Sequence, residues 1–161
     1  MTVSNMKSSD SIADSATQGG DYQATMNINA SPNAVFGALT TTSAISDWWV
    51  TASGGGNTGD ELIIHFGDSP LICHVDEAER PAHVRWTALD CDLEPDWVGT
   101  EIIFDLRPAL DGGTHLDFCH HGLTPQLECF EMCQSGWIQA LGGLLRYLEA
   151  GDGKPSGSEA N

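Results

Sequence analysis

The feature that most constrains the fold is a run of five alternating segments, followed by one amphipathic segment. Segments 61–66, 70–78, 82–89, 99–107 and 113–121 place apolar residues at every second position and are separated by turn-forming residues. This pattern is typical of antiparallel strands that share one buried face. Residues 22–28 alternate in the same way, so we expect a sheet of about six strands.

A long C-terminal helix is predicted to cover the buried face. Apolar residues recur at spacings of three and four over residues 130–148, which places them on one stripe of a helix. We expect this helix to begin at Thr124-Pro125 and to end at Gly151, because proline is tolerated at the first helical position and glycine favours termination. Two short helices are expected over residues 31–49.

These elements predict one α+β domain over residues 21–151, in which a curved antiparallel sheet wraps around the long helix. Residues 1–20 are rich in small polar residues, and we expect them to form a disordered N-terminal tail. Residues 152–161 are expected to form a flexible C-terminal tail. A sheet that grips a single helix does not close completely, so a cavity is expected between them.

Charge and cysteine content restrict the class of partner. The chain has 23 acidic and six basic residues and a formal net charge of -17, which repels nucleic acid and anionic membranes. Its five cysteines show no framework spacing, and no basic segment followed by an apolar stretch opens the chain. We therefore expect a cytoplasmic protein with free thiols and without a cofactor, and leave open whether it forms a homodimer.

Several short motifs occur in a specific order: Trp48-Trp49, Phe66-Gly67-Asp68, Trp97-Val98-Gly99-Thr100-Glu101, His120-His121-Gly122-Leu123, Cys133 and Gly136-Trp137. This ordered set resembles the START-like (SRPBCC, helix-grip) superfamily, in particular its branch of the activator of heat-shock-protein-90 ATPase homologue type. The resemblance implies a helix-grip fold with a ligand-sized interior pocket. It does not imply a common reaction.

Strand alternation and helical spacing direct a set of large side chains toward the expected cavity. Among the histidines, only His120 shares the buried register of its strand, so it is the predicted polar anchor for a ligand. The alternative for His120 is a core histidine whose ring nitrogens are satisfied by hydrogen bonds. The predicted ligand-binding residues are Trp48, Trp86, Phe104, Phe118, His120, Cys133 and Trp137.

A zinc site is also conceivable from the sequence, because Cys129 and Cys133 lie one helical turn apart and Cys119-His120-His121 lies nearby. No CxxC pair is present, however, and adjacent strand residues point to opposite faces. Free cysteines are commonly buried as small apolar residues. The sequence therefore predicts no metal site.

Three functions are compatible with these observations. The leading hypothesis is a protein that binds a small apolar or aromatic molecule in its cavity. The second is an enzyme similar to the cyclases and dehydratases of the superfamily, with His120 transferring a proton. Since acid–base catalysis normally uses two titratable groups in contrasting environments and only one is expected inside, the sequence favours binding, and no catalytic residue is assigned. The third is a chaperone cofactor or other protein partner that acts through its surface.

Overall fold

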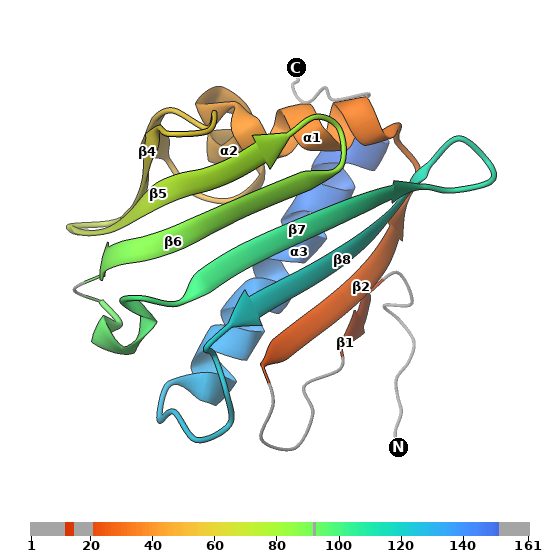
Figure 1. The fold of residues 1–161 in the computed structure, drawn as a ribbon. Helices are drawn as coiled ribbons and strands as arrows, with labels where there is room; N and C mark the ends of the chain where they lie inside the picture. The colour runs from red at the N-terminus through yellow and green to blue at the C-terminus, as the bar shows by residue number, and fades with distance from the viewer. Residues whose placement is uncertain (1–11, 15–20, 92, 152–161) are drawn as a thin grey trace.

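A computed structural model describes residues 12–14, 21–91 and 93–151, which form one antiparallel sheet and three α-helices (Figure 1). Within the sheet the strands follow the order β1-β2-β8-β7-β6-β5-β4-β3. The strands are β1 (Ile12–Asp14), β2 (Tyr22–Ile28), β3 (Ala52–Gly54), β4 (Glu61–Phe66), β5 (Ser69–Glu79), β6 (His83–Cys91), β7 (Glu101–Pro108) and β8 (Thr114–His121).

The six predicted strands are confirmed, and two short strands were not predicted. These are β3 and β1, which pair with β4 and β2 at the two edges of the sheet. Strand β1 comprises Ile12–Asp14 and therefore lies inside the segment expected to be an N-terminal tail. The rest of that segment, and the predicted C-terminal tail at 152–161, lie outside the described residues.

One face of the sheet is apolar, as the alternation predicts. Each of the central strands contributes large side chains with little or no exposure, and partners in register lie on the same face, for example Trp86 opposite Ile102 and Phe104 opposite Phe118. Strand β5 shifts register against β6 at two places, and such irregularities increase the local bend and twist of a strand. The helix-grip curvature is visible in Figure 1.

The helices lie where the sequence predicts them, with one correction. Helix α1 (Pro32–Thr40) begins after Ser31, whose hydroxyl accepts a hydrogen bond from the amide of Ala34 at 3.1 Å, and α2 (Thr42–Trp48) follows directly. Helix α3 (Phe130–Gly151) begins later than expected. Thr124-Pro125 instead opens two successive tight turns, in which the amide of Leu127 bonds to the Thr124 carbonyl and that of Phe130 to the Leu127 carbonyl.

Helix α3 crosses the apolar face of the sheet, with α1 and α2 at one end (Figure 1). Its 22 residues give a length of about 33 Å at the usual rise. The predicted stripe is buried, and Trp137, Leu141 and Leu144 expose 1% or less of their surface. None of the helices in the described part of the chain has the length and apolar composition needed to span a bilayer.

A glycine allows α3 to approach α2 closely. A Cβ atom placed on Gly143 would lie 2.4 Å from the carbonyl oxygen of Trp48, a backbone atom that cannot rotate away. The neighbouring Gly142 has room, since its added Cβ would meet only the end of the Arg146 side chain at 3.4 Å. The close approach of α2 and α3 therefore requires glycine at position 143.

We predict that Gly143→Ala destabilises the protein by about 1 to 3 kcal/mol, because the added methyl group forces α2 and α3 apart. The matched substitution Gly142→Ala should raise stability by up to about 1 kcal/mol through helix propensity alone. Urea unfolding of both variants measures the difference. Equal changes in the two variants would show that the contact with Trp48 is not what requires glycine.

Candidate functional site

An aromatic pocket lies between the first half of α3 and the C-terminal end of β6. It has a volume of about 240 Å³ and opens to the surface beside Leu93 and Met132, which are 55% and 67% exposed. The residues that line it come from the end of α2, the end of β4, the end of β6 and the segment after it, the 3-10 helix η2 (Pro95–Trp97) and α3. The lining residues are Trp49, Phe66, Cys91, Leu93, Glu94, Trp97, Met132, Cys133, Gly136 and Trp137.

Two hollows of greater volume occur elsewhere on the described surface. One, of about 570 Å³, is bordered by α1, α2 and Tyr147, and another, of about 440 Å³, lies near the β7–β8 turn and Glu149. Both are lined largely by small or polar residues. Since binding sites for small molecules are mostly apolar with a few polar groups, the smaller aromatic pocket is the better candidate.

Tryptophan rings form the wall of this pocket. Trp97 and Trp137 lie parallel, with ring centroids 5.9 Å apart and an interplanar angle of 6°. Trp49 lies 5.0 Å from Trp137 and meets Phe66 edge to face at 5.6 Å. At these centroid distances aromatic rings attract one another in addition to the free energy gained by burial. The rings of the wall therefore stabilise one another.

A chain of hydrogen bonds links the ring of Trp137 to the backbone of Trp97. The Nε1–H of Trp137 donates to Nδ1 of His120 at 2.9 Å, so Nδ1 is an acceptor and the proton lies on Nε2. Nε2 then donates to Oγ1 of Thr100 at 2.8 Å, and Thr100 donates its hydroxyl proton to the carbonyl of Trp97 at 2.6 Å. Every polar atom of the imidazole ring is satisfied.

His120 is therefore placed as a core histidine within the aromatic cluster, which was the alternative from the sequence. It is fully buried, and Trp97 lies edge-on to its ring with centroids 4.5 Å apart. Burial lowers the pKa of His120 to about 3, because the charged imidazolium would lose its hydration. The ring is neutral at physiological pH and does not line the aromatic pocket.

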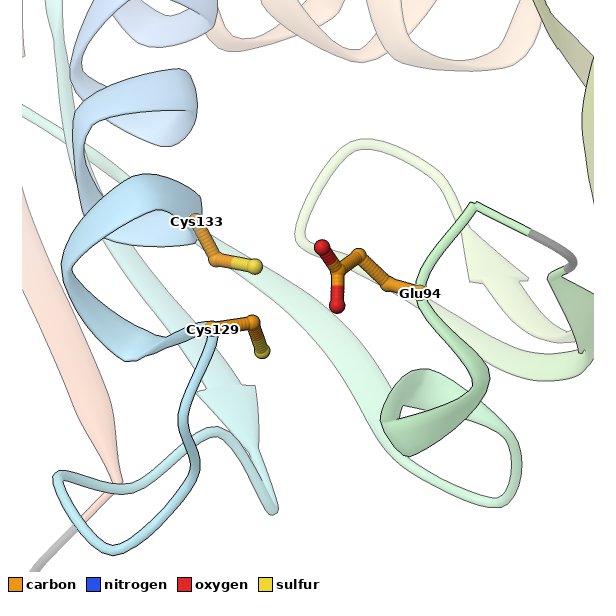
Figure 2. Close-up of side chains that lie close together, drawn as sticks. All are labelled: Glu94, Cys129 and Cys133. Atoms are coloured by element: carbon orange, nitrogen blue, oxygen red, sulfur yellow. The ribbon is translucent and has the colours of Figure 1, made fainter.

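Three potential metal ligands gather at one wall of the pocket (Figure 2). The side-chain ligand atoms of Glu94, Cys129 and Cys133 all lie within 4.8 Å of one another. Burial, together with the neighbouring Cys133 and Glu94, raises the pKa of Cys129 to about 12. Burial also raises the pKa of Cys133, although hydrogen bonds from Cys129 and Trp97 oppose this.

The structure brings only two of the seven predicted ligand-binding residues to the pocket, Cys133 and Trp137. Trp48, Trp86 and Trp137 do not surround one space, in contrast to the expected cavity wall. Trp48 stacks on Trp49 at 5.7 Å and donates its Nε1–H to the carbonyl of Ala38.

The other predicted cavity residues pack against one another inside the core. Trp86 contacts Phe104 at 5.1 Å, Phe104 contacts Phe118 at 5.2 Å, and Phe118 contacts Trp137 at 4.5 Å. The Nε1–H of Trp86 is buried and has no hydrogen-bond partner among the described residues. These rings fill the space between the sheet and α3, so the pocket forms beside them.

The family motifs include pocket residues that strand alternation did not single out as ligand-binding. Trp49, Phe66, Trp97 and Gly136 belong to the stretches that carry the family resemblance, and all line the pocket. Alternation did not identify Trp49 and Trp97, because Trp49 caps α2 and Trp97 lies on the 3-10 helix, where alternation does not hold. Glu94 had no such signal, since it lies 35 residues before Cys129 in the chain.

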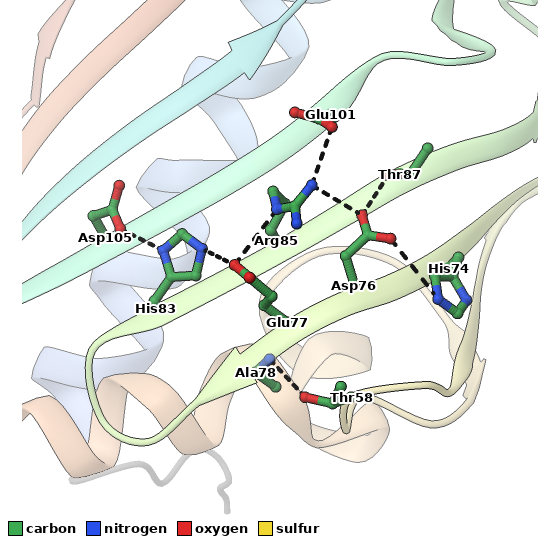
Figure 3. Close-up of polar contacts among 10 residues, drawn as sticks. All are labelled: Thr58, His74, Asp76, Glu77, Ala78, His83, Arg85, Thr87, Glu101 and Asp105. Atoms are coloured by element: carbon green, nitrogen blue, oxygen red, sulfur yellow. Dashed lines mark hydrogen bonds and ion pairs between the residues drawn. The ribbon is translucent and has the colours of Figure 1, made fainter.

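The remaining described histidines lie on the outer face of the sheet, as predicted. Figure 3 shows His83 between two carboxylates, with Nδ1 at 2.5 Å from Asp105 and Nε2 at 2.8 Å from Glu77. Beside them Arg85 lies 3.1 Å from Glu101. These cross-strand pairs are partly exposed, where ion pairs contribute little to stability, so they organise the acidic surface rather than a catalytic site.

Comparisons with known proteins agree with the fold. The model of the family described as "Activator of Hsp90 ATPase homolog 1-like protein" matches residues 29–149. No curated protein matches the chain. Similar solved structures include the Aha1 dimer from Colwellia psychrerythraea, with 27% identity, a TM-score of 0.71 and coverage of 83% of this chain and 97% of that chain.

Two further solved structures share the fold. Protein MLL2253 from Mesorhizobium loti is 23% identical, with a TM-score of 0.70 and coverage of 81% of this chain and 97% of its own. CalU16 from Micromonospora echinospora is 19% identical, with a TM-score of 0.67 and coverage of 90% and 84%. The predicted helix-grip fold is thus confirmed by structures of low sequence identity.

We predict that His120 makes the protein sensitive to acid. The unfolded chain binds a proton at this position below about pH 6.5, whereas the folded protein does so only near pH 3. Stability should therefore fall as the pH drops through this window, by up to about 1.4 kcal/mol for each pH unit. Urea unfolding between pH 4 and 7 measures the slope.

The control is His120→Asn, which keeps an acceptor for the Trp137 indole but does not titrate. This variant should be less stable than the parent at pH 7, with a shallower loss of stability toward acid. The same slope in both proteins would show that other groups cause the acid sensitivity.

Proposed function

The chain belongs to the family of Activator of Hsp90 ATPase homolog 1-like proteins, and we propose that it binds a small apolar or aromatic molecule in its tryptophan-lined pocket. The observation that carries this proposal is the wall formed by Trp49, Phe66, Trp97 and Trp137 around a space that opens to the surface. Planar rings on several sides favour a flat ligand that stacks against them.

The volume of the pocket limits the size of the ligand. Drug-sized molecules occupy pockets of roughly 300 to 1,000 Å³, whereas this pocket has about 240 Å³. A molecule with one or two fused rings is therefore the best fit for the interior. A larger ligand would extend past Leu93 and Met132 at the opening.

Electrostatics select the charge of the ligand. Glu94 is the acidic side chain that lines the described pocket, and the whole chain carries a formal net charge of -17. An anionic ligand would meet repulsion at both short and long range. We therefore propose a neutral or cationic ligand.

Binding without turnover is favoured over proton-transfer catalysis by the environment of His120. Both of its ring nitrogens are engaged, with Trp137 and Thr100. To act as an acid or base, the ring would have to break one of these bonds and turn past Trp97 and Trp137. If His120 instead holds Trp137 in position, its contacts are explained and the imidazole ring does not have to move.

We also propose that the protein is a cytoplasmic homodimer. The Colwellia psychrerythraea relative was solved as a dimer, and the five cysteines, all within the described residues, are free thiols. Sedimentation equilibrium at micromolar concentration should give the mass of a dimer. A monomer mass across the accessible concentration range would contradict this part of the proposal.

We predict that 2-naphthol, a neutral two-ring probe, quenches the tryptophan fluorescence saturably, because it enters the pocket and contacts the tryptophan rings that line it. Gly136 lines the pocket, and a Cβ atom placed there meets no atom within 4 Å, so Gly136→Leu should fill the pocket and weaken binding by at least about tenfold. Fluorescence titration in the presence of a metal chelator measures the affinity.

The matched control is Gly142→Leu, which adds the same side chain to the same helix at a position that faces Arg146 rather than the pocket. It should leave the affinity for 2-naphthol unchanged. The anionic 2-naphthalenesulfonate should bind more weakly than 2-naphthol, and this difference should shrink in Glu94→Gln. Equal, unsaturable quenching in the parent and Gly136→Leu would contradict a ligand site in this pocket.

A further inference from the structure

We propose that Cys129, Cys133 and Glu94 form a binding site for Zn²⁺. Two thiols and a carboxylate converge from separate parts of the chain, Cys129 and Cys133 at the start of α3 and Glu94 on the segment before η2 (Figure 2). The two cysteines are 5% and 7% exposed, and Glu94 is half-buried. The site shares Glu94 and Cys133 with the aromatic pocket, but the proposal does not require that the pocket binds a small molecule.

The ligand types suit zinc better than other common divalent ions. Thiolates and carboxylates are both regular zinc ligands, whereas magnesium and calcium require oxygen ligands alone. Neighbouring ligand atoms of a tetrahedral zinc site are about 3.8 Å apart when zinc–sulfur bonds are about 2.3 Å long. The three ligand atoms lie within 4.8 Å of one another, so a contraction of about 1 Å would bring them to the spacing of zinc ligands.

The surroundings of the thiols favour their metal-bound form. Trp97 donates its Nε1–H to Sγ of Cys133 at 3.2 Å, and this type of contact orients a ligand and stabilises its negative charge. Both cysteines lie at the N-terminal end of the 22-residue α3, where the helix dipole favours a thiolate. Burial, together with the neighbouring acidic groups, keeps the thiols protonated in the absence of a cation, so a bound metal ion would replace their protons.

Three protein ligands leave the fourth position of a tetrahedral zinc ion free. Glu94 and Cys133 also line the aromatic pocket, so the free position faces a space that admits water or a small molecule. Sites with three protein ligands and one open position are the arrangement that zinc adopts where it contacts exchangeable ligands. The zinc ion would thus supply a Lewis-acidic group at the wall of the pocket.

The experiment titrates the reduced, metal-free protein with Co²⁺ and then with Zn²⁺, without any aromatic probe. We expect one metal ion per chain and a near-ultraviolet thiolate-to-cobalt charge-transfer band, which Zn²⁺ then displaces. Cys129→Ser and Cys133→Ser should each remove most of this band and lower the affinity by at least about tenfold. Glu94→Gln should keep the band but weaken binding. Zn²⁺ should raise the melting temperature of the parent and leave that of both cysteine variants unchanged.

The matched controls are Cys119→Ser and Asp96→Asn, which change a thiol on the outer face of β8 and an exposed carboxylate on η2. Both should bind like the parent. No thiolate band in the parent, a band that survives in both cluster cysteine variants, or an equal loss in Cys119→Ser would each overturn the proposal. Because the parent spectrum alone is decisive, the test holds even if a variant fails to fold. A negative result would leave the binding of 2-naphthol unaffected.

Discussion

The packing of α3 across the apolar face of the sheet is the contact on which the rest of the structure depends. The sheet exposes one continuous apolar surface, and burial of such a surface is the main driving force for folding. Trp137, Leu141 and Leu144 of α3 lie in the apolar core and expose 1% or less of their own surface. Close approach at Gly143 sets the position of the helix against α2, and the helix start at Phe130 sets where its first turn faces the segment after β6.

The pocket lies where the first half of α3 meets aromatic residues from the ends of other elements, Trp49, Phe66 and Trp97. His120 has a structural part in this, since it links the indole of Trp137 on the helix to Thr100 on the sheet side. A buried polar network that is fully satisfied holds its members in one arrangement. The network thus holds the ring of Trp137 and the backbone of Trp97, which together form one side of the wall.

Most of the fold could be predicted from the sequence, because it rests on periodicity. The alternation that buries Phe104 and Phe118 depends only on their own strands, and the six main strands were found in this way. The pocket depends instead on how elements end. Trp49 terminates α2 and Trp97 lies on a 3-10 helix, where neither strand alternation nor α-helical spacing applies. Alternation therefore favoured Trp86, which packs in the core. For Trp49 and Trp97, the family motifs identified the pocket residues better than the assignment of residues to buried faces did.

The Glu94–Cys129–Cys133 cluster shows why a contact over a long sequence distance escapes such reasoning. From the sequence, the two cysteines were paired with the histidines of β8, yet His121 points outward and His120 is bound to Trp137 and Thr100. The third group, Glu94, lies on the segment after β6 and reaches the two cysteines at the start of α3. Glu94 and Cys129 are 35 residues apart in the chain, so their contact follows from the packing of separate elements, which the periodicity of a single strand or helix does not report.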